Sequence, residues 1–298
     1  MSAPRADLLR ALGALCEAPD PGHAALAEAL GLDLPEDPAA RTATFLFQVY
    51  PYASVHLGPE GMLGGEATDR VAGFWRAVGR TPPTEPDHLA ALLGLAAALA
   101  DAEVAEPEPA RRALRREARA ALLWEHLLSW VVPFLRATAS AGTSFHAGWA
   151  SLVEATLLED ARSLGAAPTR LSAHLRAAPP FPEDDAALDE LLAATLAPVR
   201  SGVVLTRDDL TRAGRALGVG VRIGERRFIL RAMLQQDPAG TLRWLAAEAA
   251  RWAEIHAATR ADLGPVAVFW EERARAAEAR FLRLSTAAEE VMAGAAGR

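Results

Sequence analysis

The sequence contains no lysine and no asparagine, and Cys16 is the single cysteine among its 298 residues. One cysteine cannot form a disulfide within the chain, and it excludes a metal cluster held by several thiolates. All of the positive charge belongs to arginine. The net charge of −7 argues against nonspecific nucleic-acid binding, because that binding needs a cationic surface.

Long apolar runs are also missing. No stretch approaches the roughly 20 apolar residues with which a helix crosses a bilayer. Charged residues interrupt the apolar ones at the start of the chain, and this pattern is not typical of a signal peptide. We therefore expect a cytoplasmic protein that does not insert into a membrane.

Helical periodicity dominates the segments that are present, and hydrophobic residues make up 51% of the chain. The only β-like runs, at 201–205 and 218–224, are short. Apolar residues at helical spacing predict helices over 66–79, 89–100, 110–139, 146–164 and 266–291. Pro133 is expected to end or kink the third of these helices. The predicted fold class is all-α.

Two proline-rich acidic segments, at 101–110 and 177–185, are typical of linkers. The second is a candidate seam between two regions. We therefore expect a helical domain over residues 1–180 and a mainly helical C-terminal extension over residues 181–298.

The stretch TEPDHLAALL, residues 84–93, has the residues of a helix start. Thr84 is a good N-cap, and Asp87 three residues later completes a pair like a capping box. Capping leaves His88 unexplained. Glu85 and His88 have the Glu-x-x-His spacing of di-iron bundles, but those sites need a second copy and two further glutamates, and no second copy is found. A metal site is weakly supported.

Two other stretches hold candidate binding residues. The loop-like segment PYASVHLGPEG, residues 51–61, follows Tyr50 and contains Tyr52 and His56. It is either a packed loop or a binding surface, since loops often carry function. The helix WEHLLSWVVPFL, residues 124–135, sets Glu125 and His126 beside an apolar face and is more typical of a core helix with a polar edge.

Two arginine-rich stretches complete the candidates. The arginines of 110–120 are typical of a solvated helix face. Residues 204–220 predict a short helix capped by Thr206 that stops near Gly218, and it could be half of a helix-turn-helix. No Walker loop, dinucleotide fingerprint or nucleophile elbow is present. We therefore expect no enzyme activity and no catalytic residues.

Four motifs in register resemble the TorD/DmsD/NarJ family of redox-enzyme maturation chaperones. PYASVHLGP is similar to the family's Pro-aromatic-x-Ser-Val-Tyr segment, with His56 where a tyrosine is commoner. VAGFWRAVG resembles its helix that ends in an aromatic pair and a glycine. EPDHLAALLGLAAAL resembles its Pro-Asp-His-Leu helix start, and WEHLLSWVVPFL its Glu-His-Leu-x-x-Trp-x-x-x-Phe helix. The likeness covers residues 1–165, and residues beyond about 180 form an extension.

The resemblance implies an all-helical chaperone without a cofactor or a metal. Such a chaperone binds the twin-arginine leader peptide, the apo-catalytic subunit of a molybdenum-cofactor oxidoreductase, or both, until the cofactor is inserted. Acidic residues would pair with the arginines, and aromatic residues would add apolar and cation–π contacts. The predicted binding residues are Tyr52, Ser54, His56, Phe74, Trp75, Glu85, Asp87, His88, Glu125 and His126.

Two alternatives remain open. A metal- or cofactor-binding helical enzyme would use Glu85, His88, Glu125 and His126, and a regulator would use residues 204–235 on DNA. The acidic net charge favours a basic ligand and no nucleic acid. The sequence leaves the client enzyme, the role of the extension and a homodimer undecided.

Overall fold

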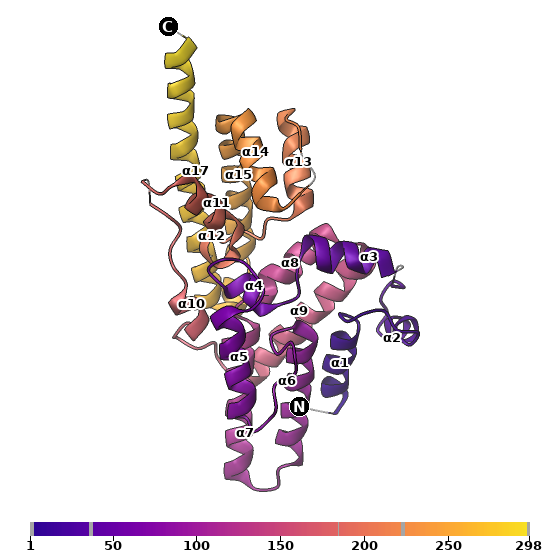
Figure 1. Cartoon of the computed structure of the whole chain (residues 1–298). Coiled ribbons are helices and arrows are strands. Elements are labelled where there is room, and N and C mark those ends of the chain that lie inside the picture. The colour runs from indigo at the N-terminus through magenta and orange to yellow at the C-terminus, as the bar shows by residue number, and fades with distance from the viewer. Residues whose placement is uncertain (1–2, 36–37, 184, 222–223, 297–298) are drawn as a thin grey trace. The chain divides into compact units, whose positions relative to one another are not determined.

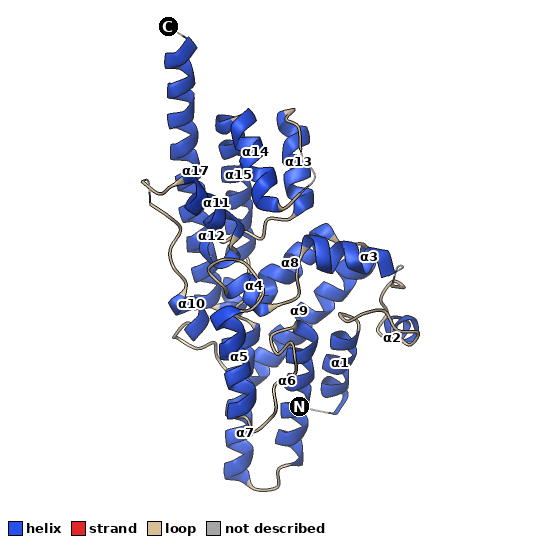
Figure 2. Cartoon of the chain, viewed as in Figure 1, coloured by secondary structure: helices blue, strands red, loops and turns tan. Residues whose placement is uncertain are grey.

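The computed structural model describes residues 3–35, 38–183, 185–221 and 224–296. These residues form α-helices and two π-helices, and they contain no β-strand (Figure 2). The predicted all-α class is confirmed. No helix within the described ranges is both long and apolar enough to cross a membrane.

The chain divides into two compact units (Figure 1). Unit 1 comprises the residues up to Gly58 and Leu63–Ala177, and unit 2 comprises Pro59–Met62 and the residues from Ala178 onward.

In unit 1, α1 packs on α6 and α8 packs on α9. The core between them is rich in aromatic side chains: Trp130, Phe134 and Trp149 are fully buried, and the indole nitrogen of Trp149 donates to Leu12 O at 2.9 Å. The helices of unit 1 are α1 (Ala3–Ala14), α2 (His23–Ala29), α3 (Pro38–Thr42), π-helix η1 (Ala43–Gln48), α4 (Ala53–Leu57), α5 (Gly65–Ala77), α6 (Leu89–Ala105), α7 (Pro109–Ala121), π-helix η2 (Leu122–Leu127), α8 (Val131–Ala141), α9 (Ser144–Leu164) and α10 (Ala173–Ala177).

In unit 2, the long helices α15 and α17 pack along one another, mostly through buried alanines and tryptophans. The rings of Trp252 and Trp270 both pack near the buried His256 ring, with centroids 5.4 and 5.8 Å from its centroid. The helices of unit 2 are α11 (Leu188–Leu196), α12 (Pro198–Ser201), α13 (Arg207–Leu217), α14 (Arg226–Gln236), α15 (Pro238–Ala257), α16 (Arg260–Leu263) and α17 (Pro265–Ala296).

Several boundaries differ from the predictions. The helical stretch 110–139 breaks at Leu128–Trp130, and Pro133 lies in the first turn of α8, where its missing N–H costs no hydrogen bond. The predicted linker at 101–110 is wrong as well. Helix α6 continues to Ala105, and α7 begins at Pro109 after a short turn.

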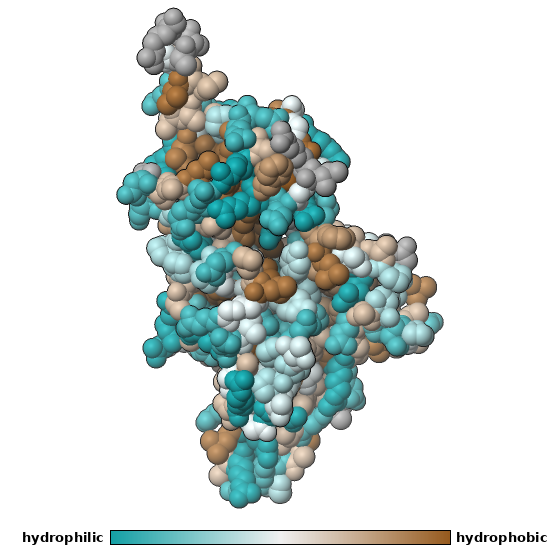
Figure 3. All heavy atoms as spheres, viewed as in Figure 1, coloured by the Kyte–Doolittle hydropathy of each residue, from teal (hydrophilic) through white to brown (hydrophobic). Residues whose placement is uncertain are grey.

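On the face shown in Figure 3, the hydrophobic side chains form separate patches among polar ones. Single exposed apolar side chains are ordinary on a protein surface and do not by themselves indicate a partner. The cavities and the polar groups that line them are therefore stronger candidates for a binding site.

Candidate functional site

Two distant segments of unit 1 pair where helices α4 and α6 begin. Tyr52 and His88 form an isolated antiparallel bridge. Ala53 N donates to Asp87 O at 3.0 Å, and Leu89 N donates to Pro51 O at 2.8 Å. The first amides of a helix have no partner within the helix. Each segment therefore supplies acceptors for the helix start of the other, and this pairing fixes Tyr52 beside His88.

Asp87 completes the start of α4. Its carboxylate accepts a hydrogen bond from Ser54 N at 2.9 Å, and the residue is only 3% exposed. The acid thus caps a helix that lies 33 residues earlier in the chain. Thr84 is not the N-cap of α6, as the sequence had suggested, because the helix begins at Leu89 and His88 caps it.

His88 serves α6 with one ring nitrogen. Its Nδ1 accepts a hydrogen bond from Ala90 N at 3.2 Å, so in the neutral ring Nε2 carries the proton. Burial lowers the pKa of His88 below 6.5, although the nearby Glu85 carboxylate acts in the opposite direction. The ring is therefore neutral at pH 7, with an Nε2–H donor that Ala90 does not use.

Tyr52 connects the pairing to the surface. Its ring packs edge-on against His88 with 4.8 Å between centroids, and its hydroxyl donates to the exposed Glu85 carboxylate at 2.9 Å. Burial, followed by the hydrogen bond to Glu85, raises the pKa of Tyr52 to about 12. The phenol stays protonated and holds the Glu85 carboxylate in place.

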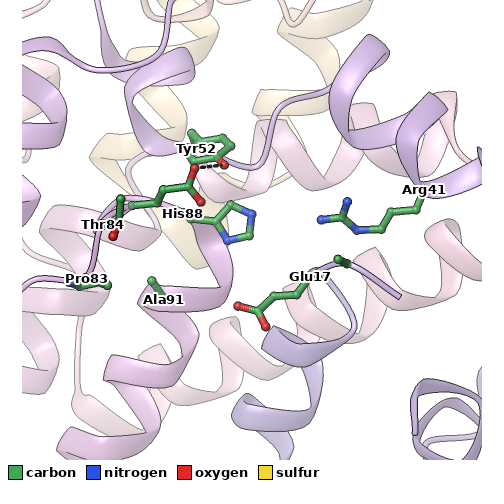
Figure 4. Close-up of a pocket in the computed structure, with 9 residues that line it drawn as sticks. Glu17, Arg41, Tyr52, Pro83, Thr84, His88 and Ala91 are labelled. Atoms are coloured by element: carbon green, nitrogen blue, oxygen red, sulfur yellow. Dashed lines mark hydrogen bonds between the residues drawn. The ribbon is translucent and has the colours of Figure 1, made fainter. Parts of the chain in front are cut away.

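These groups line an open cavity of about 630 Å³ in unit 1 (Figure 4). Three predicted residues, Tyr52, Glu85 and His88, lie on its wall. Sequence reasoning missed two charged residues of the same wall, Glu17 and Arg41. The full lining is Glu17, Ala18, Arg41, Tyr52, Pro83, Thr84, Glu85, His88 and Ala91.

Glu17 also lines a second, larger cavity of about 720 Å³. Its wall comes from the end of α1 and from α2, and Ala14, Leu26 and Ala29 contribute apolar surface to it. The exposed Glu17 side chain therefore borders both cavities, one walled mainly by polar groups and one with a larger apolar share.

Comparison with known families bears on the segment that builds the cavity. Residues 16–136 match the family model described as nitrate reductase delta subunit. That range includes Glu17, Arg41, Tyr52, Glu85 and His88. This segment, less than half of the chain, is similar to the nitrate reductase delta subunit family. This family is of the NarJ/TorD chaperone type, so the resemblance predicted from the four motifs is confirmed. A search of curated proteins finds no match to the chain.

The match to the nitrate reductase delta subunit family implies a chaperone of molybdoenzyme maturation and suggests a molybdoenzyme partner. Residues beyond 136 lie outside the match. The family motif around residues 51–61 is split between surface and core in this chain. Tyr52 reaches the cavity, whereas Ser54 and His56 are buried.

The buried residues of that motif hold the cavity wall in shape. Ser54 Oγ accepts from Gly64 N at 3.2 Å. His56 Nε2 lies 2.9 Å from Tyr50 O, and its ring stacks on Trp130 with 5.2 Å between centroids. Neither Ser54 nor His56 lines the cavity of Figure 4.

The predicted aromatic pair on α5 faces two directions. The half-buried Trp75 donates its indole N–H to Pro86 O at 3.1 Å and so fastens the segment before His88. Phe74 instead packs against His126, with 4.8 Å between ring centroids. Neither ring lines the cavity, and Trp75 supports the cavity wall through its hydrogen bond to Pro86.

Glu125 and His126 belong to a different cluster, on η2. Glu125 Oε2 accepts from Ala173 N at 2.7 Å, which caps the start of α10. His126 Nδ1 lies 3.1 Å from His174 Nε2. Burial lowers the pKa of His126 to about 4 and that of His174 to about 3, with His126 adding to the second shift. This cluster joins α10 to η2 and does not line the cavity of Glu85 and His88.

The geometry also bears on the two alternative functions, a metal- or cofactor-binding enzyme and a DNA-binding regulator. Within the described ranges, no three His, Cys, Asp or Glu side chains are placed to hold a metal ion. Helix α13 begins at its predicted cap, Thr206, and ends before Gly218, and α14 follows it. On α14, Arg227 and Arg231 both pair with Asp189, so an acidic side chain already meets these cations.

Proposed function

We propose that the protein is a cytoplasmic maturation chaperone that binds the twin-arginine leader peptide of a molybdoenzyme through the cavity of unit 1. It would hold the apo-catalytic subunit until its cofactor is inserted, without catalysing a reaction. The observation that carries the proposal is the Glu85 carboxylate, which Tyr52 holds at an open cavity within the family segment.

The chemistry of the cavity suits an arginine side chain. Glu85 and Glu17 offer exposed carboxylates, which form short, charge-assisted and bidentate hydrogen bonds with guanidinium groups. The Tyr52 ring adds a face for cation–π contact. The neighbouring cavity over α1 and α2 has room for part of the apolar stretch that follows the arginines in a leader.

Of the ten predicted residues, we assign ligand contact to Tyr52, Glu85 and His88. The other seven have positioning roles in this proposal. Asp87 and Ser54 set the start of α4, and His56 supports the same segment from the core. Those with more remote supporting roles are Phe74, Trp75, Glu125 and His126.

The proposal is tested with a synthetic peptide that carries an arginine pair followed by an apolar, helix-forming stretch. Calorimetry with the full chain should give micromolar or tighter binding. Glu85→Gln should weaken binding about tenfold, because a hydrogen bond between charged groups becomes a neutral one. A peptide with two lysines should also bind more weakly, since lysine lacks the bidentate fork.

Glu117→Gln is the matched control, because Glu117 is an exposed acid of α7 outside the cavity and its change alters the net charge equally. Its affinity should equal that of the wild type. Equal losses for Glu85→Gln and Glu117→Gln would indicate general electrostatic attraction in place of a site. An absence of binding to the wild-type chain would refute the proposal.

A further inference from the structure

Among the described residues that line the cavity, Arg41 is the one that carries a guanidinium. It lies near the end of α3, where Nη2 donates to Cys16 O at 2.9 Å and the guanidinium carbon lies 5.8 Å from the centroid of the Phe45 ring. These contacts hold the side chain in one orientation without neutralising its charge. Its Nε is buried and has no hydrogen-bond partner among the described residues.

The contrast with Arg119 shows what is unusual about this arginine. Arg119 is buried and pairs with two carboxylates, Glu103 and Asp160. Within the described part of the chain, Arg41 has no carboxylate oxygen within 4.0 Å, although Glu17 lines the same cavity. A charge that is fixed, partly buried and not paired with any carboxylate of the described residues is suited to an anionic group of a ligand.

His88 adds a second donor to this part of the wall. Because Nδ1 caps α6, its other nitrogen, Nε2, is the donor of the neutral ring. Figure 4 shows the His88 ring and the Arg41 guanidinium directed toward one another across the cavity, with Tyr52 on the other side of His88 from Arg41. The cavity thus has the Tyr52-bound carboxylate of Glu85 at one end and the Arg41 guanidinium at the other, and Glu17 lies on the Arg41 side of its wall.

The balance of charge selects the kind of anion. The wall carries two carboxylates, Glu17 and Glu85, and one guanidinium. A free, multiply charged anion such as phosphate would be repelled by both carboxylates, whereas a peptide with a basic and an acidic side chain matches both ends. We propose that Arg41, with His88 beside it, binds a side-chain carboxylate of the same peptide whose arginine binds Glu85. This inference rests on the proposed function of the cavity.

A glutamate scan of the synthetic peptide tests it. A single glutamate replaces a glutamine at successive positions on either side of the arginine pair, and each peptide is titrated into the full chain. At one position or two neighbouring ones, glutamate should bind about tenfold more tightly than glutamine, as expected for a charge-assisted hydrogen bond. In Arg41→Gln that preference should disappear, whereas in the exposed-residue control Arg76→Gln it should persist.

Charge reversal separates recognition from a structural role of Arg41. In Arg41→Glu, a peptide with arginine at the selected position should bind more tightly than its glutamate counterpart, which a merely misfolded cavity could not produce. Free glutamate and inorganic phosphate, added at millimolar concentration, should not compete appreciably.

The outcomes distinguish the two proposals. If Glu85→Gln weakens binding but no position of the scan prefers glutamate, or if Arg41→Gln keeps the preference, the inference about Arg41 is wrong and the proposed function stands. Strong competition by phosphate would also overturn it, in favour of a free anion. If no peptide binds the wild-type chain, both proposals fail.

Discussion

Helix α13 of unit 2 and helix α6 of unit 1 begin in different ways. At α13, Thr206 Oγ1 accepts from Asp209 N at 3.1 Å and Asp209 accepts from Thr206 N at 2.8 Å, so four consecutive residues complete the cap. At α6, the cap is the imidazole of His88, which is held in place by its bridge to Tyr52, 36 residues earlier in the chain. Unit 2 starts this helix with local sequence, whereas unit 1 uses distant partners and a histidine.

The two units also differ in the number of buried histidines whose pKa is lowered. Burial lowers the pKa of His126 and His146 to about 4, that of His174 to about 3 and that of His88 below 6.5, and all four lie in unit 1. In unit 2, the same direction is found for His256, with a pKa of about 4. Neutral imidazoles inside unit 1 cap helices and line the candidate site, and they make that unit sensitive to acid.

Acid should therefore lower the unfolding free energy of unit 1 more than that of unit 2, and this is the largest effect expected. Below pH 6.5 the unfolded chain protonates His126, His146, His174 and His256, while in the folded chain each of them stays neutral until about pH 4 or lower. The unfolding free energy should fall by about 1.4 kcal/mol per pH unit for each such histidine. At pH 5, unit 1 should lose on the order of 5 kcal/mol or more relative to pH 7, and unit 2 about 2 kcal/mol.

Tryptophan indole N–H signals resolve the two units in an NMR-monitored urea titration. Four tryptophans lie in unit 1 and three in unit 2. The signals of unit 1 should vanish at lower urea concentration as the pH falls from 7 to 5, ahead of those of unit 2. If both sets shift together, or if unit 2 yields first, the contrast in histidine burial does not govern acid stability.

The same contrast explains what could be predicted from the sequence. The start of α13 at Thr206 and its end before Gly218 depend on residues within one turn, and that prediction is confirmed. The start of α6 depends on Pro51, on Asp87 facing Ser54 and on Trp75, which come together only in the fold. Thr84 had the right residue type for a cap, but these tertiary contacts move the helix start to Leu89.

The cavity was predictable in part, for the same reason. Tyr52, Glu85 and His88 belong to family motifs that could be recognised in register. Glu17 and Arg41 lie outside those motifs, and no local pattern connects them with Glu85 and His88, which follow them by more than 40 positions. The clustering of charge around a site is a property of packing, which periodicity does not reveal.

Arg119 gives the next largest test, again in unit 1. The arginines of 110–120 were interpreted as a solvated face, but Arg119 is 3% exposed and donates to Asp160 at 2.7 Å as well as to Glu103. Arg119→Ala would leave the buried carboxylates of Glu103 and Asp160 with only their longer contacts to Arg116 at 3.5 Å and Arg5 at 3.8 Å, and it should cost about 3 kcal/mol in chemical denaturation. Arg111→Ala removes only the exposed pair with Glu108 and should cost less than about 0.5 kcal/mol. Similar losses for both variants would contradict the assigned network.

Two glycines of unit 2 provide the smallest and most closely matched comparison. Gly202 and Gly218 have nearly the same backbone angle, φ +70° and +69°. A Cβ at Gly202 would come within 2.7 Å of Trp270 O and closer still to Ala274 N, whereas one at Gly218 would meet no atom within 4 Å. Gly218→Ala should therefore cost only the left-handed strain, about 1 kcal/mol.

Gly202→Ala adds displacement of α17 to that strain and should cost about 3 kcal/mol in urea denaturation. It should also disturb the hydrogen bond of 2.8 Å between His256 Nε2 and Gly202 O, which is visible as a shift of the His256 ring signals. If the two variants lose equal stability, the close approach of Gly202 to α17 contributes nothing. In that case unit 2 depends on its local caps and turns alone, and the contrast with unit 1 becomes sharper.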